Sequence, residues 1–233
     1  MSLGESFKLL VSSRYLLMIA LLVICYGISM NLIETLWKAQ VKEQFPTKSG
    51  FNDFMQNLFI STGIFTMVII LLSKSLVQKF GWFRGAICTP IIMLVTGSGF
   101  FAFVFWGGYM SGFAATFGTT SLMMAIWIGT AQNVFSKGVK YGLFDPTKEM
   151  AYIPLDKNSK TRGKAAIDVI GGRLGKAGGG YISSGLMMLF GGATLAEIAP
   201  MLTVFVLAVV LLWIYAVYTL SGLYNSKIKE IGE

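Results

Sequence analysis

The sequence predicts an all-α membrane protein whose transmembrane domain is a bundle of six helices. Hydrophobic residues make up 55% of the 233 residues and charged residues only 13%, whereas about a quarter of the residues are charged in soluble domains. The mean hydropathy is +0.68. The apolar residues gather into long runs, and a run of about 20 residues lets a helix cross a bilayer.

Six such runs follow one another, and each is predicted to form one transmembrane helix. In chain order they cover residues 15–36, 54–72, 86–106, 113–135, 165–190 and 199–223. The first run is too long for the apolar region of a signal peptide, and glycines and charges interrupt the fifth. The predicted parts are therefore a linker segment at 1–14, a six-helix domain at 15–225 with a connector at 136–164, and a tail at 226–233.

Turn signals separate the predicted spans. Phe45-Pro46-Thr47 follows the first span, and Gly81-Trp82 lies between the second and third, where the tryptophan is expected to anchor at the membrane interface. Within the connector, turns are predicted at Asp145-Pro146-Thr147 and Ile153-Pro154-Leu155, with one or two helical turns between them.

The charges of the loops predict the orientation. The loops on the side of the two termini are strongly basic: they contain Lys8, Arg14, Lys74, Lys79, Arg84, the connector, Lys227 and Lys229. On the opposite side, Lys38, Lys42 and Lys48 are offset by Glu43 and Asp53, and the later loops contain no Lys or Arg. The positive-inside rule therefore places both termini in the cytoplasm.

Composition also excludes several classes of function. The chain has no histidine, so chemistry that depends on imidazole is excluded. Cys25 and Cys88 lie in apolar runs and are expected to be free, buried thiols. No nucleophile–base pair and no carboxylate cluster with metal spacing is present, so we expect neither an enzyme nor a bound cofactor or metal. The net charge is +8. In a membrane protein the distribution of this charge among the loops means more than its total, so it does not indicate nucleic-acid binding.

Glu34 is the first candidate site residue, because a charge in a membrane span is costly and marks function. Gly27, Asn31, Glu34 and Lys38 follow spacings of four, three and four residues, so they share one helix face. That face is predicted to point into the bundle or a watery cavity. In the alternative interpretation, Glu34 lies at the outer interface and only pairs with Lys38.

Arg173 and Lys176 are the second candidates, three residues apart on the fifth span. Gly171, Gly175 and Gly179 recur every four residues around them, and small residues at this spacing let another helix approach closely. Cations beside exposed backbone suit phosphate. In the alternative interpretation the glycines are only a packing seam and the cations are interfacial anchors. Function is expected where this span meets the first one.

Other polar residues carry weaker signals. Asp168 lies near these cations and is expected to neutralise one of them. The amides of Gln56, Asn57, Gln132 and Asn133 are equally well explained as bonds between neighbouring helices. The glycine-rich run is not a nucleotide-binding P-loop, because Ile170 occupies the position of its first glycine and Ala177 the position of its Ser or Thr.

Several runs of residues closely resemble the ATP/ADP translocases of obligate intracellular bacteria and plastids. The most specific is the run from Asp145 to Asp156, which reads DPTKEMAYIPLD. The others are Ser2–Phe7, Tyr26-Gly27-Ile28-Ser29, Asn31-Leu32-Ile33-Glu34, Trp37-Lys38, Phe80-Gly81-Trp82, Gln132-Asn133, Phe135-Ser136-Lys137, Lys140-Tyr141, Gly163–Val169 and Arg173-Leu174-Gly175-Lys176. The resemblance covers nearly the whole chain.

The resemblance implies a fold and an activity. Members of this family look like twelve-helix transporters of the major facilitator type, built from two six-helix halves, and this chain resembles the C-terminal half. Two halves related in this way hold the substrate between them. The implied function is exchange of ATP for ADP, with the missing N-terminal half and membrane lipid as partners and no nucleic acid. The implied location is the bacterial inner membrane, with the plastid inner envelope as the alternative.

The resemblance also assigns roles. Glu34 of the NLxE motif and Lys176 of the LGK motif match charges that the family uses, and Asn31, Asn133 and Arg173 are expected to join them in substrate binding. Gate or charge-pair roles are expected for Lys38, Asp145, Lys148, Glu149 and Asp168. The chain departs from the family at Ala177 and at 181–184, which leaves the nucleotide preference open.

Two other functions fit the sequence. The first is a proton-coupled importer of another nucleotide or of NAD, with Glu34 or Asp168 carrying the proton. The second is a membrane scaffold subunit with no transport of its own. Dependence of uptake on a pH gradient, or stabilisation by nucleotide, separates these from an exchanger.

Overall fold

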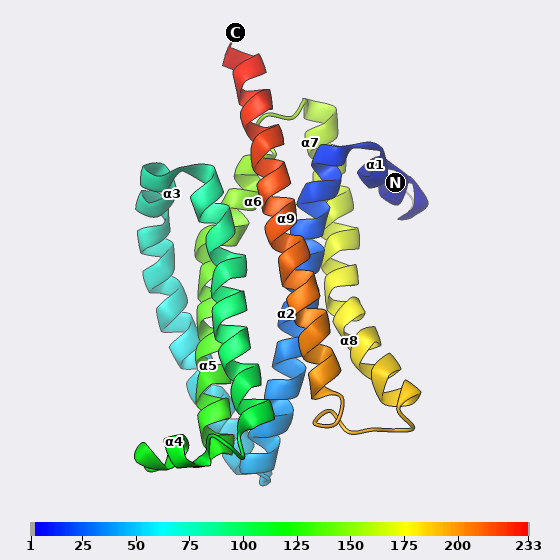
Figure 1. The fold of residues 1–233 in the computed structure, drawn as a ribbon. Helices are drawn as coiled ribbons and strands as arrows, with labels where there is room; N and C mark the ends of the chain where they lie inside the picture. The colour runs from blue at the N-terminus through cyan, green and yellow to red at the C-terminus, as the bar shows by residue number, and fades with distance from the viewer. Residues whose placement is uncertain (1–2, 233) are drawn as a thin grey trace.

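The computed structural model describes residues 3–232, without the side chains of residues 3, 4, 6, 73–80, 231 and 232. In this part of the chain the regular secondary structure is entirely helical (Figure 1). Ser2 of the resemblance and the side chains of Lys74 and Lys79, used to predict the orientation, lie outside the described residues.

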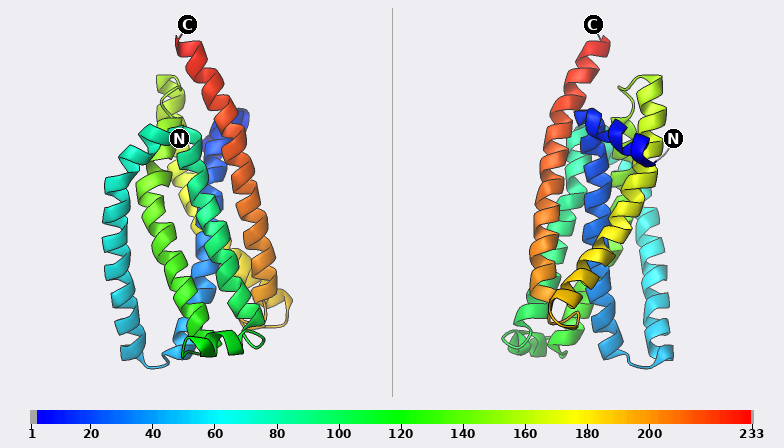
Figure 2. Two further views of the ribbon diagram at one scale, coloured as in Figure 1. Left: turned by 60° about the vertical axis from the view of Figure 1, so that its left-hand side comes forward. Right: turned by 90° about the vertical axis from the view of Figure 1, so that its right-hand side faces the viewer.

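The helices form a bundle with both termini at the same end (Figure 1). They are α1 (Leu3–Ser12), α2 (Arg14–Gln44), α3 (Lys48–Trp106), α4 (Ser111–Thr116), α5 (Ser121–Val139), the π-helix η1 (Lys140–Phe144), α6 (Asp145–Ala151), α7 (Lys157–Ala166), the π-helix η2 (Ile167–Gly171), α8 (Gly172–Leu189) and α9 (Ala199–Gly232). In the predicted linker, α1 lies across the end of the bundle while the long helices run along it (Figure 2).

Four helical stretches in the described residues are long and apolar enough to cross a membrane: Arg14–Gln44, Lys48–Leu72, Gly81–Trp106 and Ala199–Glu230. They correspond to the predicted first, second, third and sixth spans. The other two predicted spans are helices, α5 and α8, but polar side chains and glycines lower their hydropathy. The prediction of a helical membrane protein is confirmed, and the crossing of the membrane by α5 and α8 stays a prediction.

Caps and glycines set the first boundaries. Ser13 caps α2 by accepting from the Leu16 amide, and Thr47 caps α3 by accepting from the Gly50 amide, so the predicted break after the first span is confirmed. Within α3, Gly81 has a φ of 80°, a value that glycine adopts without strain, and the chain turns back there to form two arms (Figure 1).

Trp82, predicted to anchor at the membrane interface, packs against other parts of the protein. Its side chain is buried, its indole Nε1 donates to the Thr147 carbonyl at 2.8 Å, and its ring stacks on Tyr224 with centroids 5.1 Å apart. A buried indole N–H needs an acceptor, and the carbonyl of α6 supplies it. Trp82 therefore ties the second arm of α3 to α6 and α9.

The predicted fourth span, 113–135, is displaced along the chain. Residues 111–116 form the separate helix α4, Gly118 adopts a φ of 66°, and α5 begins only at Ser121, after Thr120 accepts from the Met123 amide. At its other end α5 continues through η1 into α6, so the turn predicted at Asp145-Pro146 is wrong. A proline removes one backbone donor, and the wider turn of η1 directly before it lets the helix continue.

The predicted connector is therefore mostly helical. Helix continues from α5 to Ala151, and the predicted turn at Ile153-Pro154-Leu155 is confirmed. Asp156 then caps α7, which runs through η2 into α8. The hydrogen bonds from Ser159 and Asn158 hold the pKa of the Asp156 carboxyl below its ordinary value. Helix α9 likewise continues through the predicted tail as far as Gly232.

A buried aromatic cluster joins three of these elements. Tyr26 of α2 stacks on Phe144 of η1 with ring centroids 5.4 Å apart, and Trp213 of α9 packs edge-on against both rings. Such contacts stabilise a packed core beyond the burial of their area. The cluster fixes α2 and η1 against α9, so the polar residues nearby are held on a rigid frame.

Candidate functional site

Helices α2 and α8 contact each other along a seam of small residues. A Cβ atom placed on Gly27 would lie 2.6 Å from the Cα atom of Gly175, and one on Gly179 would lie 2.5 Å from Asn31 Oδ1. One on Gly171 would lie 3.1 Å from Val23 Cγ1. The glycines at four-residue spacing therefore pack on the first span, as predicted, and α8 crosses α2 obliquely (Figure 2).

Glu34 lies three residues beyond Asn31 on α2 and contacts two lysines. Its Oε1 atom is 3.0 Å from Lys38 Nζ on the same helix and 3.4 Å from Lys137 Nζ on α5. The side chains of Glu34 and Lys137 are each 24% exposed, and that of Lys38 is 46% exposed. The predicted pair with Lys38 is confirmed, but the carboxylate also bonds across the bundle, so the interpretation as a simple interfacial pair is too narrow.

Lys137 is the functional candidate that the sequence analysis missed. It was counted among the basic residues of the connector, whereas the structure places it on α5 opposite Glu34. A signal for it existed: Asn133, Lys137 and Tyr141 recur every four residues and therefore share a helix face. The three charges of Glu34, Lys38 and Lys137 leave one positive charge in excess, which would favour an anion close to this group.

The amides near Glu34 are buried in the bundle. Asn133 is fully buried and donates from Nδ2 to the Gly129 carbonyl at 2.9 Å, while Gln132 donates from Nε2 to Ser136 Oγ at 3.2 Å. Among the described residues, the side-chain oxygens of Asn31, Gln132 and Asn133 have no hydrogen-bond partner. In this conformation Asn133 contributes to packing within α5, and its binding role stays a prediction.

Arg173 and Lys176 are exposed on α8. No ion pair of either cation occurs in the part of the chain that the structure describes, and Glu34 bonds to Lys38 and Lys137 instead. The two cations therefore lie on the α8 surface, next to the glycine seam, and are open to an anionic ligand. Their role in substrate binding stays a prediction.

Apart from Lys38, the predicted gate residues form two groups of ion pairs. Lys140 Nζ is 2.8 Å from Asp145 Oδ2, which links η1 to the start of α6. Lys148 Nζ is 3.5 Å from Asp168 Oδ1 and 3.6 Å from Glu149 Oε1, so it joins α6 to η2. Asp168 thus neutralises a cation, as predicted, but this cation is Lys148 and not Arg173 or Lys176.

Glu149 extends the second group to α7. Its Oε2 atom accepts from Lys164 Nζ at 2.6 Å, and this hydrogen bond raises the pKa of the Lys164 ammonium. The side chain of Lys148 is only 14% exposed, whereas the three charges around it are at least 43% exposed. Lys148 is therefore the most buried member of the network that joins α6 to α7 and η2.

A cation also lies among aromatic rings at η1. Lys140 Nζ is 4.1 Å from the ring centroid of Tyr141 and 5.9 Å from that of Tyr26. Both distances fall within the range of cation–π contacts. Since π-helical turns often occur at functional sites, η1 and its charges belong to the candidate site.

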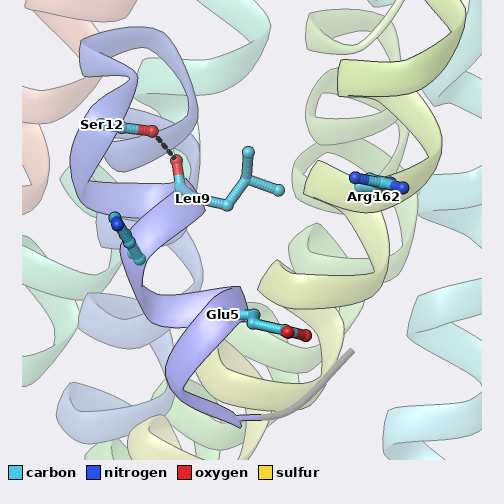
Figure 3. Close-up of a pocket in the computed structure, with 5 residues that line it drawn as sticks. Glu5, Leu9, Ser12 and Arg162 are labelled. Carbon is cyan, nitrogen blue, oxygen red and sulfur yellow. Dashed lines mark hydrogen bonds between the residues drawn. The ribbon is translucent and has the colours of Figure 1, made fainter.

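Two hollows lie near these charges. One of about 560 Å³ includes Thr35, Lys38, Phe51 and Leu195 in its lining, so it opens beside the Glu34 group. The other, of about 520 Å³, lies between α1 and α7, where Glu5 and Arg162 extend toward it from the two helices and Ser12 donates to the Leu9 carbonyl (Figure 3). The second hollow lies at the end of the bundle near the termini, away from Glu34.

A bundle of apolar helices with charged side chains held between them is typical of a membrane transporter. The profile of the TLC ATP/ADP transporter family matches residues 1–224. The chain therefore belongs to this family, which confirms the resemblance found in its sequence.

Named relatives come from bacteria and plastids. The chain is 46% identical to ADP,ATP carrier protein 1 of Chlamydia trachomatis over 100% of its own length and 45% of that protein. It is 45% identical to the chloroplastic ADP,ATP carrier protein 2 of Arabidopsis thaliana, covering 97% of the chain and 36% of that protein. It is 44% identical to ADP,ATP carrier protein 1 of Rickettsia bellii, covering 97% of the chain and 45% of that protein.

The chain thus spans less than half the length of these relatives. No solved structure matches it.

Proposed function

We propose that this chain forms the C-terminal half of a carrier that exchanges ATP for ADP across a membrane. The observation that carries the proposal is the similarity of the whole chain to proteins named ADP,ATP carriers, at 46% identity for one from Chlamydia. The excess positive charge around Glu34 and the exposed cations of α8 support it, because polyphosphates bind to groups of Lys and Arg residues.

The proposed half consists of six spanning helices: α2, the two arms of α3, α5, α8 and α9. Both termini lie at one end of the bundle, which fits an even number of crossings (Figure 1). Unlike the other four, α5 and α8 contain no apolar stretch long enough to be recognised as a span, which is expected where helices face a polar path or another half and not lipid. The missing N-terminal half is then the partner that completes a twelve-helix transporter of the major facilitator type.

Within this half, Glu34, Asn31, Arg173 and Lys176 are proposed to face the nucleotide, together with Asn133 if the bundle opens. The connector charges Asp145, Lys148, Glu149 and Asp168 are proposed to form a gate, with Lys38 as a charge partner of Glu34. We place the protein in the bacterial inner membrane with both termini in the cytoplasm, because the basic loops lie at the end of the termini. The plastid inner envelope is the second possible location.

The test is uptake of labelled ATP into vesicles that contain a two-half transporter, meaning this chain expressed with the first half of a relative. Vesicles are either loaded with ADP or left empty, and vesicles with this chain alone serve as the control. Uptake that needs both halves and internal ADP is expected. Uptake into empty vesicles driven by a pH gradient would instead support the proton-coupled importer, and absence of uptake with no nucleotide binding would support the scaffold.

Replacing Lys176 with glutamine is expected to raise the KM for ATP about tenfold in the two-half transporter, because one charge-assisted contact to phosphate contributes on the order of 1.4 kcal/mol. Lys160→Gln, which removes an exposed charge from α7, serves as the control and should leave the KM unchanged. An unchanged KM in Lys176→Gln would remove this residue from the proposed site.

Replacing Lys148 with alanine is expected to uncouple exchange, so that labelled ATP leaks from vesicles without ADP outside. The reason is that Lys148 joins Glu149 of α6 to Asp168 of η2, and both carboxylates lose this partner. Lys157→Ala removes an exposed lysine of α7 and should leave coupling intact. Tightly coupled exchange in Lys148→Ala, at normal protein levels, would contradict a gate at the connector.

A further inference from the structure

We propose that Lys137 is a phosphate-binding residue of the nucleotide site and that Glu34 holds it in position while the site is empty. The inference rests on the proposed function and identifies the group that receives the polyphosphate. It starts from the contact between Lys137 Nζ and Glu34 Oε1 at 3.4 Å, which joins two helices whose positions in the sequence are 103 residues apart.

The charges around Glu34 favour the capture of an anion. A single carboxylate oxygen accepts from both Lys38 and Lys137, and the described residues provide no second carboxylate within ion-pair distance of either lysine. Lys137 is also three-quarters buried, where screening by water is weaker than at the surface. A polyphosphate carries several negative charges and therefore competes strongly with one carboxylate for this ammonium.

Lys137 can break its ion pair with Glu34 without leaving the Glu34 carboxylate unpaired. Lys38 lies one turn from Glu34 on the same helix, at 3.0 Å, and keeps the carboxylate neutralised when Lys137 turns to a ligand. Lys137 has no second carboxylate to pair with, because its ion pair in the described part of the chain is with Glu34. Lys137 is therefore the exchangeable member of the group, and Lys38 is the permanent one.

The neighbours of Lys137 extend the site from α5 into η1. Lys140, one turn further on in η1, is paired with Asp145 and lies against the ring of Tyr141, which is 52% exposed. A second cation and an exposed aromatic ring next to Lys137 suit a ligand that has both phosphates and a flat base, since bases stack on aromatic side chains. Lys137 would bind the phosphate portion of such a ligand on α5, whereas the exposed cations lie on α8, the other neighbour of α2.

The inference also gives the contact between α2 and α5 a function. While the site is empty, the ion pair joins the two helices. When phosphate binds Lys137, the ion pair between Lys137 and Glu34 breaks. It forms again when the nucleotide leaves. A ligand shifts a conformational equilibrium only through contacts that differ between the states, and this exchange of partners is such a contact.

The experiment measures stabilisation of the purified two-half transporter by inorganic tripolyphosphate, ATP and AMP, as the shift in its melting temperature. Tripolyphosphate is expected to stabilise the parent protein, and Lys137→Gln is expected to lose most of this shift while Lys137→Arg keeps it. The loss should be larger for ATP than for AMP, because ATP carries more phosphate charge. Lys48→Gln, an exposed lysine at the start of α3, is the matched control and should retain the shift.

A double variant separates phosphate binding from a structural role. If the ion pair only joins helices, Glu34→Gln combined with Lys137→Gln removes both charges together and should restore ligand-induced stabilisation. We expect no restoration, because the double variant still lacks the ammonium. Three results would overturn the inference: restored stabilisation in the double variant, a melting-temperature shift in Lys137→Gln equal to that of the parent, or no shift in the parent protein.

The readout also distinguishes failure of the inference from failure of the proposed function. If tripolyphosphate stabilises the parent protein through Lys137 but the protein does not exchange ATP for ADP, the phosphate site is supported and the proposed function is contradicted. If the parent protein exchanges nucleotides and Lys137→Gln is stabilised by tripolyphosphate as much as the parent, the proposed function is supported and the site at Lys137 is contradicted.

Discussion

Replacing Gly27 with alanine is expected to push α8 away from α2 and to slow exchange. The added Cβ atom would lie 2.6 Å from the Gly175 Cα atom and 2.9 Å from its carbonyl carbon, and neither backbone atom has a rotamer that can move away. Overpacking of this kind costs about 1–3 kcal/mol. The helix that carries Arg173 and Lys176 must therefore shift, so both the melting temperature and the rate of exchange should fall.

Gly180→Ala is the matched control for this change. Gly180 lies on α8, and a Cβ atom added there meets nothing within 4 Å. Alanine also has the better helix propensity, by about 1 kcal/mol, so this variant should be as stable as the parent or more so. Equal melting temperatures for Gly27→Ala and Gly180→Ala would show that α2 and α8 do not pack as closely as described.

The α2–α8 seam is also the feature of the site that the sequence predicted best. The four-residue spacing of Gly171, Gly175 and Gly179 is a local pattern, and a helix turns such a pattern directly into one face. The same reasoning placed Asn31, Glu34 and Lys38 on a common face of α2. Local spacing was sufficient because each helix is long and continuous around these residues.

The ends of helices were predicted less well, because local signals compete there. Asp145-Pro146 is a strong turn signal, yet the helix continues through it after the π-helical turn of η1. In the other direction, hydropathy alone joined α4 to α5, although Gly118 and the Thr120 cap separate them. Hydropathy reports burial in lipid or protein, and it does not report where the backbone bends.

The partners of charged residues were predictable only within one helix. The pair of Glu34 and Lys38 follows from i,i+4 spacing, whereas the pair of Glu34 and Lys137 depends on the packing of α2 against α5. Asp168 illustrates the same limit: the nearest cations in sequence are Arg173 and Lys164, but its ion-pair partner is Lys148, 20 residues away. A contact between helices needs the tertiary arrangement, which one sequence does not provide.

The charges fall into two groups at different levels of the bundle. The network of Lys148, Glu149, Lys164 and Asp168 lies where α6 and α7 meet, at the end that holds both termini (Figure 1). Glu34 lies 20 residues into α2, or about 30 Å along it, and thus toward the opposite end. In the proposed carrier, contacts must close each side in turn, and we propose that the ion pairs at these two levels are such contacts.

Glu34→Gln is expected to lower the rate of exchange about 100-fold, equivalent to about 2.7 kcal/mol in the rate-limiting step. The variant leaves Lys38 and Lys137 without the carboxylate that both contact, so they repel each other beside the seam. At 24% exposure the lost ion pair is neither fully buried nor fully solvated, and we expect a loss of stability of about 1–3 kcal/mol. Glu43→Gln, an exposed acid on the same helix, should match the parent protein.

Binding and exchange should respond differently to this change. Nucleotide binding should persist in Glu34→Gln, because both ammonium groups remain and neither has to be released from a carboxylate. Exchange should slow, because no carboxylate then displaces the phosphate from Lys137 and bound nucleotide leaves slowly. Melting-temperature shifts with ATP and exchange rates, measured on the same preparation, distinguish the two effects. Equal loss of both would mean that Glu34 contacts the nucleotide itself, through its ribose or its amino group, so that the carboxylate acts as a ligand and not as the group that resets the site.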